Sequence, residues 1–190
     1  MDALLTSTLV VALAEIGDKT QLLAIVLATR FKRPLPIVMG ILVATLANHF
    51  LAALVGEQAA TLLDGQWFRY VIAISFILMA GWTLIPDTFD EEDEHKPARF
   101  GAFAATAIAF FLVEMGDKTQ VATIALGAQY QSVLPVMTGT TLGMMIANVP
   151  AVFLGNELIK RVPLATVRIA AALLFLAIGL WLLAQTAGWL

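Results

Sequence analysis

Six apolar stretches, each about as long as a membrane-spanning helix, restrict the folds open to this chain. They lie near residues 4–29, 35–55, 68–86, 100–127, 133–154 and 167–187. A helix needs about 20 apolar residues to cross the core of a bilayer, so six would take roughly 120 residues. The rest of the 190 residues suffices for short connections and leaves no room for a separate soluble domain. We therefore predict an all-α membrane protein with six transmembrane helices and the lipid bilayer as its surroundings.

Composition agrees with this prediction and removes several kinds of chemistry. The chain is 60% hydrophobic and 13% charged, against roughly 45 to 50% and about 25% in soluble domains. It has no cysteine, which excludes disulfides, thiolate metal sites and thiol catalysis. No Lys or Arg precedes Lys19, so the basic region of a cleavable signal peptide is missing and the first stretch is expected to remain as a helix.

Two nearly identical polar heptapeptides interrupt the first and fourth stretches. They read Glu-Ile-Gly-Asp-Lys-Thr-Gln at 15–21 and Glu-Met-Gly-Asp-Lys-Thr-Gln at 114–120, an offset of 99 residues. The same offset relates Pro36 to Pro135, Gly40 to Gly139 and Gly56 to Gly155. The chain therefore reads as a duplication, with repeat 1 at 1–86, an acidic linker at 87–99 and repeat 2 at 100–190.

An odd number of spans in each copy makes the second copy enter the membrane from the opposite side. The fold class predicted is thus two inverted three-helix repeats, an arrangement common in transporters, whose binding sites lie near the midplane between repeats. Basic residues set the orientation, because cytoplasmic loops are enriched in Lys and Arg. Only Arg69 lies on the expected outer side, whereas eight lie on the other: Arg30, Lys32, Arg33, Lys96, Arg99, Lys160, Arg161 and Arg168. Both termini should be outside and the 87–99 linker in the cytoplasm.

The heptapeptides place four carboxylates and two ammonium groups at bilayer depth. At about 2.5 to 3.5 kcal/mol each, six such charges facing lipid would cost roughly 15 to 20 kcal/mol, so they should face one another or a wet cavity. On a continuous helix Glu15, Asp18 and Lys19 share one face, and the second motif repeats this spacing. The alternative is that Glu15 with Lys19, and Glu114 with Lys118, form ion pairs that only join helices.

Charge counting favours a cation site over purely structural pairing. Four acids and two lysines leave two negative charges, which a divalent ion would neutralise. Oxygen ligands suit Mg²⁺, Ca²⁺ and Mn²⁺, and protons would occupy the empty site, which predicts cation/proton exchange. The ligands expected first are Glu15, Asp18, Glu114 and Asp117. Lys19 and Lys118 would hold carboxylates in place and oppose monovalent ions, while Gly17 and Gly116 would allow close helix approach or loosen the backbone.

Other polar residues of the spans are candidates with an alternative beside each. Gln21 and Gln120, and Asn48 and Asn148, could add amide oxygens to the metal shell or hydrogen-bond between helices. Thr20 and Thr119 could be ligands or bond back to their own backbone carbonyls. His49 has Val149 as its counterpart, so it could be a proton relay, an asymmetric ligand or neither. Small residues at Gly139 and Gly143, mirrored at Gly40 and Ala44, predict close helix packing.

The paired Glu-x-Gly-Asp-Lys-Thr motifs resemble those of the family of bacterial manganese exporters and Golgi manganese/calcium-proton exchangers. The resemblance covers the whole chain, including the acidic linker, and both motifs match in full. It implies transport of divalent cations with Glu15, Asp18, Glu114 and Asp117 as ligands. Short members of this kind are implied to export Mn²⁺ across the bacterial inner membrane, and the missing targeting region favours that case here.

Three other functions are alternatives to Mn²⁺/proton exchange. Ca²⁺/proton exchange fits the same oxygen ligands. An intramembrane lipid-phosphate hydrolase is disfavoured because such sites recruit Arg and no span has Arg in its core; the chain is therefore expected not to be an enzyme, and no cofactor or nucleic-acid partner is predicted. A passive channel fits poorly with buried lysines and paired acids. The acidic linker is expected to be a solvated connection, or alternatively an antenna for cations. The sequence leaves the oligomeric state and the choice between Mn²⁺ and Ca²⁺ open.

Overall fold

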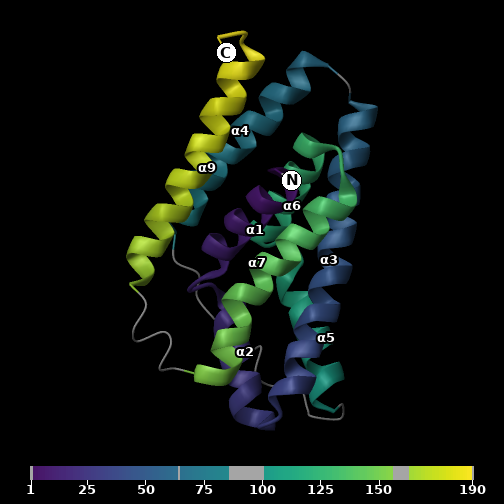
Figure 1. Ribbon diagram of the computed structural model, residues 1–190, viewed down its shortest axis with the longest axis vertical. Helices are drawn as coiled ribbons and strands as arrows, with labels where there is room; N and C mark the ends of the chain where they lie inside the picture. The colour runs from purple at the N-terminus through teal and green to yellow at the C-terminus, as the bar shows by residue number, and fades with distance from the viewer. Residues whose placement is uncertain (1, 64, 86–100, 156–162, 190) are drawn as a thin grey trace.

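A computed structural model describes residues 2–63, 65–85, 101–155 and 163–189, and its regular structure over these ranges is helical throughout. Figure 1 shows the helices, which are α1 (Asp2–Glu15), α2 (Lys19–Phe31), α3 (Pro34–Leu62), α4 (Gln66–Thr83), α5 (Ala102–Glu114), α6 (Lys118–Tyr130), α7 (Val133–Leu154) and α9 (Leu164–Thr186). The all-α prediction is confirmed for these residues. The acidic linker at 87–99 lies outside them.

Each heptapeptide breaks its span into two helices, so the prediction of one continuous helix through each motif is wrong. Helix α1 ends at Glu15 and α2 begins at Lys19, and the same break separates α5 from α6. In the second motif Met115 (φ −65°, ψ 120°) and Gly116 (φ 80°) form the centre of a type II turn, closed by the Asp117 N–H donating to the Glu114 carbonyl at 3.2 Å.

The first motif turns in the same way. Gly17 has φ 86°, and the Asp18 N–H donates to the Glu15 carbonyl at 3.1 Å. The third residue of a type II turn needs a positive φ, which glycine adopts without a steric penalty. The motif side chains therefore come together around a turn between two half-helices, and not along one helix face.

Helices of the two halves pack against each other across the molecule. Helix α1 lies against α7, α5 lies against α3, and α4 pairs with α9. In Figure 1 the chain descends through α1 and α2 and ascends through α5 and α6, so these two broken segments run in opposite directions. Their breaks lie close together inside the bundle, because Glu15 at the first break and Glu114 and Asp117 at the second have ligand atoms within 4.8 Å of one another.

Small residues make the close packing possible, as the Gly-x-x-x-Gly spacing predicted. A Cβ atom on Gly139 would lie 2.5 Å from the Leu4 carbonyl oxygen of α1. One on Gly40 would lie 2.8 Å from the Phe103 carbonyl oxygen of α5. Because glycine has no Cβ, the two helix backbones can approach closely at these positions. Close backbones in membrane proteins gain van der Waals contact and weak hydrogen bonding. The predicted small-residue contacts within one chain are confirmed.

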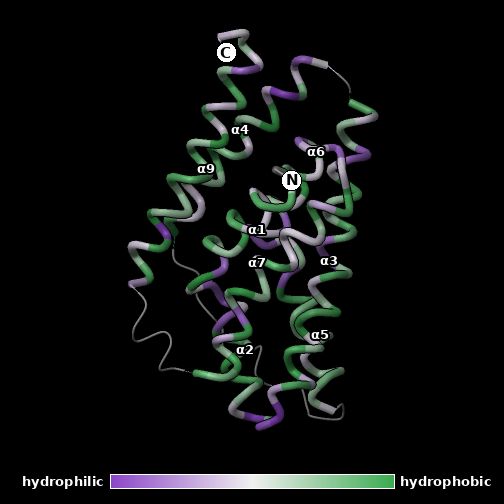
Figure 2. Tube along the Cα trace, in the orientation of Figure 1, coloured by the Kyte–Doolittle hydropathy of each residue, from purple (hydrophilic) through white to green (hydrophobic). Residues whose placement is uncertain are grey.

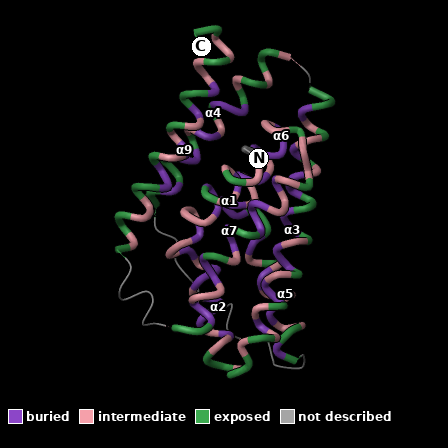
Figure 3. The backbone as a smooth tube through the Cα atoms, in the orientation of Figure 1, coloured by how far each residue is buried: buried purple, intermediate pink, exposed green. Residues whose placement is uncertain are grey.

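The outer surface is apolar and the polar side chains are gathered inside. Among the described residues α3, α7 and α9 are each long and apolar enough to cross a membrane, and α1 and α5 are shorter apolar helices. Figure 2 shows hydrophobic residues along the outer helices, and Figure 3 shows exposed positions on the same helices. Leu78, Leu173 and Trp181 are examples of large apolar side chains exposed on α4 and α9. This surface suits lipid, so the chain is a membrane protein.

Candidate metal centre

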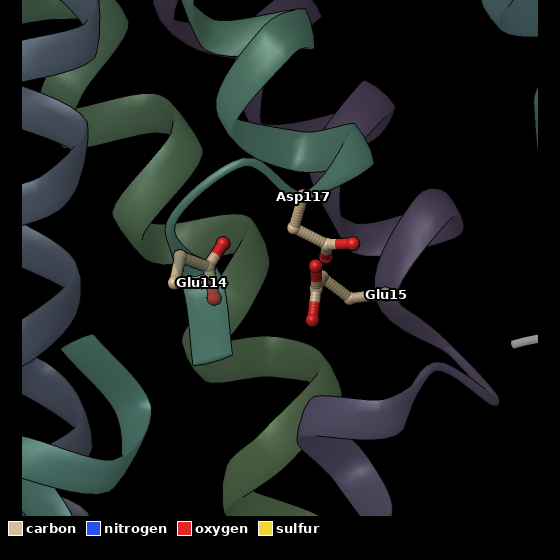
Figure 4. A group of neighbouring side chains, drawn as sticks. All are labelled: Glu15, Glu114 and Asp117. Atoms are coloured by element: carbon tan, nitrogen blue, oxygen red, sulfur yellow. The ribbon is translucent and has the colours of Figure 1, made fainter. Parts of the chain in front are cut away.

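Three carboxylates converge where the two broken segments meet. One oxygen from each of Glu15, Glu114 and Asp117 lies within 4.8 Å of the other two, and all three residues are buried. Figure 4 shows the carboxyl groups facing one another, with Glu15 at the end of α1 and the other two on either side of the second turn. The chain thus brings Glu15 together with two acids that lie 99 and 102 positions later in the sequence.

These carboxylates keep oxygen atoms available for a ligand. Glu15 Oε1, Glu114 Oε2 and Asp117 Oδ2 are buried and have no hydrogen-bond partner among the described residues. A buried carboxylate oxygen without a donor loses its hydration with no compensation. Three such oxygens in one place are therefore an arrangement that a cation, or protons, would stabilise.

The threonines of the motifs hold the glutamates in position. Thr20 Oγ1 donates to Glu15 Oε2, and Thr119 Oγ1 donates to Glu114 Oε1 at 2.7 Å. Back-bonding of these hydroxyls to their own backbone carbonyls, which was the alternative to ligation, is not what the structure has. The turn explains why, because it folds the second residue of the following helix back over the glutamate.

Among the described residues, the ion pair made by a motif lysine joins the two motifs, and is not the i, i+4 pair with the glutamate of its own motif that was the alternative to a cation site. Lys19 Nζ lies 3.1 Å from Asp117 Oδ1, so it joins the first motif to the second. Lys118 is buried, and its Nζ donates to the Ile85 carbonyl oxygen at 3.0 Å. The ion pair between motifs places the Lys19 ammonium beside Asp117, next to the two glutamates.

Asp18 occupies the place in the first motif that Asp117 has in the second, but the two differ in position. Both aspartates precede a helix with extended backbone angles, Asp18 before α2 and Asp117 before α6. Partial positive charge at these helix starts favours a carboxylate there. Asp18 is buried, yet the group of mutually close ligand atoms in the described residues contains only Asp117 of the pair. The centre is therefore asymmetric.

The motif glutamines connect the turns to the neighbouring helices. Gln21 Oε1 accepts from the Gly17 N–H at 3.0 Å, and Gln120 Oε1 accepts from the Gly116 N–H at 2.6 Å. The Gln21 amide donates to the Ala147 carbonyl of α7 at 2.9 Å. In this conformation the amide oxygens close the turns, and the amide N–H groups make the helix-to-helix bonds that were the alternative to ligation.

The two asparagines sit at matching places but bond differently. Asn48 donates to the Phe111 carbonyl oxygen at 3.1 Å and accepts from the Gln120 amide at 3.0 Å. Asn148 donates to the Met144 carbonyl oxygen at 3.1 Å, and its Oδ1 is buried without a partner among the described residues. Of the two, Asn148 retains an amide oxygen that could approach a ligand.

His49 reaches the centre from α3, although the duplication gave it no counterpart. The side chain is wholly buried and its Nε2 lies 3.5 Å from Glu114 Oε1. Met115, by contrast, is 56% exposed, in keeping with a side chain directed away from Glu114. The sequence offered a signal for the contact made by His49, since a histidine beside Asn48 inside an apolar span needs a polar partner.

Known proteins with similar sequences are described as transporters of divalent cations or by the name of one family. The sequence profile described as "Divalent cation/proton antiporter GDT1" matches residues 3–91 and again residues 102–189. A protein of Vibrio cholerae serotype O1, described provisionally as a manganese exporter, is 50% identical over 95% of this chain and 90% of its own. A GDT1-like protein of Synechocystis sp. is 29% identical over 92% of this chain and 93% of its own.

A plant relative extends the likeness further. A GDT1-like protein of Arabidopsis thaliana is 27% identical over 88% of this chain and 89% of its own. No solved structure matches the chain. The matched proteins are named as transporters or by this family, which supports the expectation that the chain is not an enzyme. The chain belongs to the GDT1 family of divalent cation/proton antiporters.

Proposed function

We propose that this chain exports Mn²⁺ across a bacterial inner membrane in exchange for protons. The observation that carries the proposal is the buried carboxylate triad of Glu15, Glu114 and Asp117, whose orphaned oxygens suit a hard or borderline divalent cation. The relative from Vibrio cholerae, described as a manganese exporter, favours Mn²⁺ as the substrate. Asp18 is the fourth acid of the proposed site, with Gln21, Gln120, Asn48 and Asn148 as amide candidates.

Charge balance explains why protons are the counter-ion. The motif acids and lysines carry two negative charges in excess when all are ionised. A divalent cation neutralises this excess, and when the cation leaves, two protons would do the same. An empty and fully ionised site is costly inside a bilayer. The carboxylates therefore bind either the metal ion or protons. That alternation is what couples metal movement to proton movement.

The proposed architecture is six spans in two inverted repeats, 1–86 and 100–190, joined by a cytoplasmic linker. Two observations support it, the double match of the family profile and the opposite directions of the broken segments in Figure 1. Helices α1 and α2 together have 27 residues and rise roughly 40 Å, enough to cross the bilayer as one discontinuous span. Discontinuous helices surround the ion sites of many transporters.

Reconstituted protein tests the proposal. Proteoliposomes with an imposed proton gradient should take up Mn²⁺ with saturation, and Glu15→Gln, Asp18→Asn, Glu114→Gln and Asp117→Asn should each lower uptake at least about tenfold. Glu57→Gln is the matched control, because Glu57 lies in α3 outside the two motifs. Wild-type uptake in all four motif variants would contradict the proposed site.

The second candidate, Ca²⁺/proton exchange, uses the same ligands. Uptake by the same proteoliposomes distinguishes it from Mn²⁺/proton exchange. Mn²⁺ and Ca²⁺ are supplied separately and then in competition. We expect Mn²⁺ uptake at lower concentrations than Ca²⁺ uptake, and the reverse order would replace the first proposal with the second. Uptake that neither saturates nor moves protons would instead indicate a channel.

A further inference from the structure

His49 is a buried imidazole beside the carboxylate triad. Its exposed fraction is 0%, and neither ring nitrogen has a hydrogen-bond partner among the described residues. Burying an imidazole costs free energy that no hydrogen bond from the described residues offsets. Among the described residues, Glu114 is the charged group within ion-pair distance of this ring, with 3.5 Å between Nε2 and Oε1. A buried polar side chain without a hydrogen-bond partner commonly binds a ligand.

The duplication does not explain this histidine. Val149 stands at the matching position of α7, where an apolar side chain satisfies the packing. The neighbouring Asn48 is already bonded to Gln120 and to the Phe111 carbonyl, so it holds this part of α3 against the second motif. Nε2 of His49 is thereby fixed on the side of the triad formed by Glu114.

We propose that Nε2 of His49 is a ligand of the transported divalent cation and its one nitrogen donor, bound next to Glu114. The inference deepens the proposed function and rests on it. Metal–ligand bonds of about 2.0 to 2.4 Å place neighbouring donors roughly 3 Å apart and opposite donors up to almost 5 Å apart. The 3.5 Å between Nε2 and Glu114 Oε1, and the 4.8 Å limit within the triad, fit one shell after a small adjustment.

A nitrogen ligand changes which cation the site prefers. Carboxylate oxygens accept Ca²⁺, Mg²⁺ and Mn²⁺, whereas imidazole suits transition-metal ions and contributes little to Ca²⁺ or Mg²⁺. An all-carboxylate site would therefore discriminate poorly between Mn²⁺ and the abundant Ca²⁺ and Mg²⁺. With His49 in the shell, the same three acids favour Mn²⁺.

Electron spin echo spectroscopy of bound Mn²⁺ tests this ligand directly. The full chain carries one other histidine, His95, which is replaced by His95→Gln so that His49 alone remains. This protein is prepared with ordinary and with ¹⁵N-labelled histidine, purified in detergent and loaded with Mn²⁺. We expect ¹⁴N modulation that changes to the ¹⁵N pattern on labelling. Bound Mn²⁺ without histidine nitrogen coupling would overturn the inference and leave the proposed function standing.

Transport by His49→Gln gives the second readout. We expect the KM for Mn²⁺ to rise at least about fivefold while the KM for Ca²⁺ changes less than about twofold, so that selectivity falls. A merely structural role would move both constants together, and that result would contradict the inference. Wild-type protein that neither binds nor transports Mn²⁺ would instead remove the proposed function on which the inference rests.

Discussion

At the scale of single residues, a threonine after the turn orients the glutamate before it. Thr119 Oγ1 donates to Glu114 Oε1, and Thr20 Oγ1 donates to Glu15 Oε2. In each glutamate the other oxygen has no hydrogen-bond partner among the described residues. Each glutamate is the last residue of its helix and is buried, and the hydroxyl is the hydrogen-bond donor that restrains its carboxylate. The hydroxyl therefore keeps a ligand oxygen in place when the site is empty, which lowers the entropy lost on metal binding.

Removing this hydroxyl should weaken metal binding without unfolding the protein. A hydrogen bond to a charged group contributes about 1.5 to 3 kcal/mol, so Thr119→Val should raise the KM for Mn²⁺ at least about tenfold, and Thr119→Ser should restore it. Thr123→Val is the matched control, because Thr123 is buried on the same helix and bonds only to the Thr119 carbonyl. An unchanged KM in Thr119→Val would exclude the positioning role.

At the scale of elements, the turn at each motif depends on its glycine. Gly17 and Gly116 have φ values of 86° and 80°, and a side chain in this region costs about 1 to 2 kcal/mol. A Cβ on Gly116 would meet no atom within 4 Å, so the cost there is conformational alone. A Cβ on Gly17 would also lie 2.7 Å from Leu164 Cδ2.

Alanine at these positions should therefore lower the midpoint of thermal unfolding of the purified protein. We expect Gly116→Ala to lower it by a few degrees and Gly17→Ala by more, because only the latter adds a steric contact. Gly101→Ala is the control, with φ −61° and open space around its Cβ position. If all three variants unfold at the same temperature, the turn does not need glycine.

The break at each motif is also where prediction from sequence reached its limit. Apolar residues on both sides of Glu15 and Lys19 read as one hydrophobic run, so periodicity predicted an uninterrupted helix. A run of apolar residues indicates that a segment lies in lipid, but it does not predict the backbone angles at a single glycine. The acids that converge were identified from their duplication, whereas the pairing of Lys19 with Asp117 depends on the turn and required the structure.

At the scale of the whole molecule, the two halves complete each other. Helix α1 packs on α7 and α5 packs on α3, so each broken segment is held by the long helix of the other half. Glu15 from the first half joins Glu114 and Asp117 from the second, and neither half alone contains the triad. The duplication in the sequence predicted this convergence, and the packing of each half on the other is its physical cause.

The absence of cysteine from the chain allows the predicted inverted arrangement to be tested at two matched positions. Lys32 follows α2 and Gln131 follows α6, they are 99 positions apart, and both are exposed with left-handed backbone. Two inverted repeats place such equivalents on opposite sides of the membrane, and the basic residues predict Lys32 in the cytoplasm. In intact spheroplasts we therefore expect a membrane-impermeant maleimide to label Gln131→Cys and not Lys32→Cys, with both labelled after the membrane is opened. Because the two positions share the same local structure, reactivity differs only through the side on which each lies. Equal labelling of both in intact spheroplasts would place the two positions on the same side of the membrane and would remove the two-sided architecture from the proposed function.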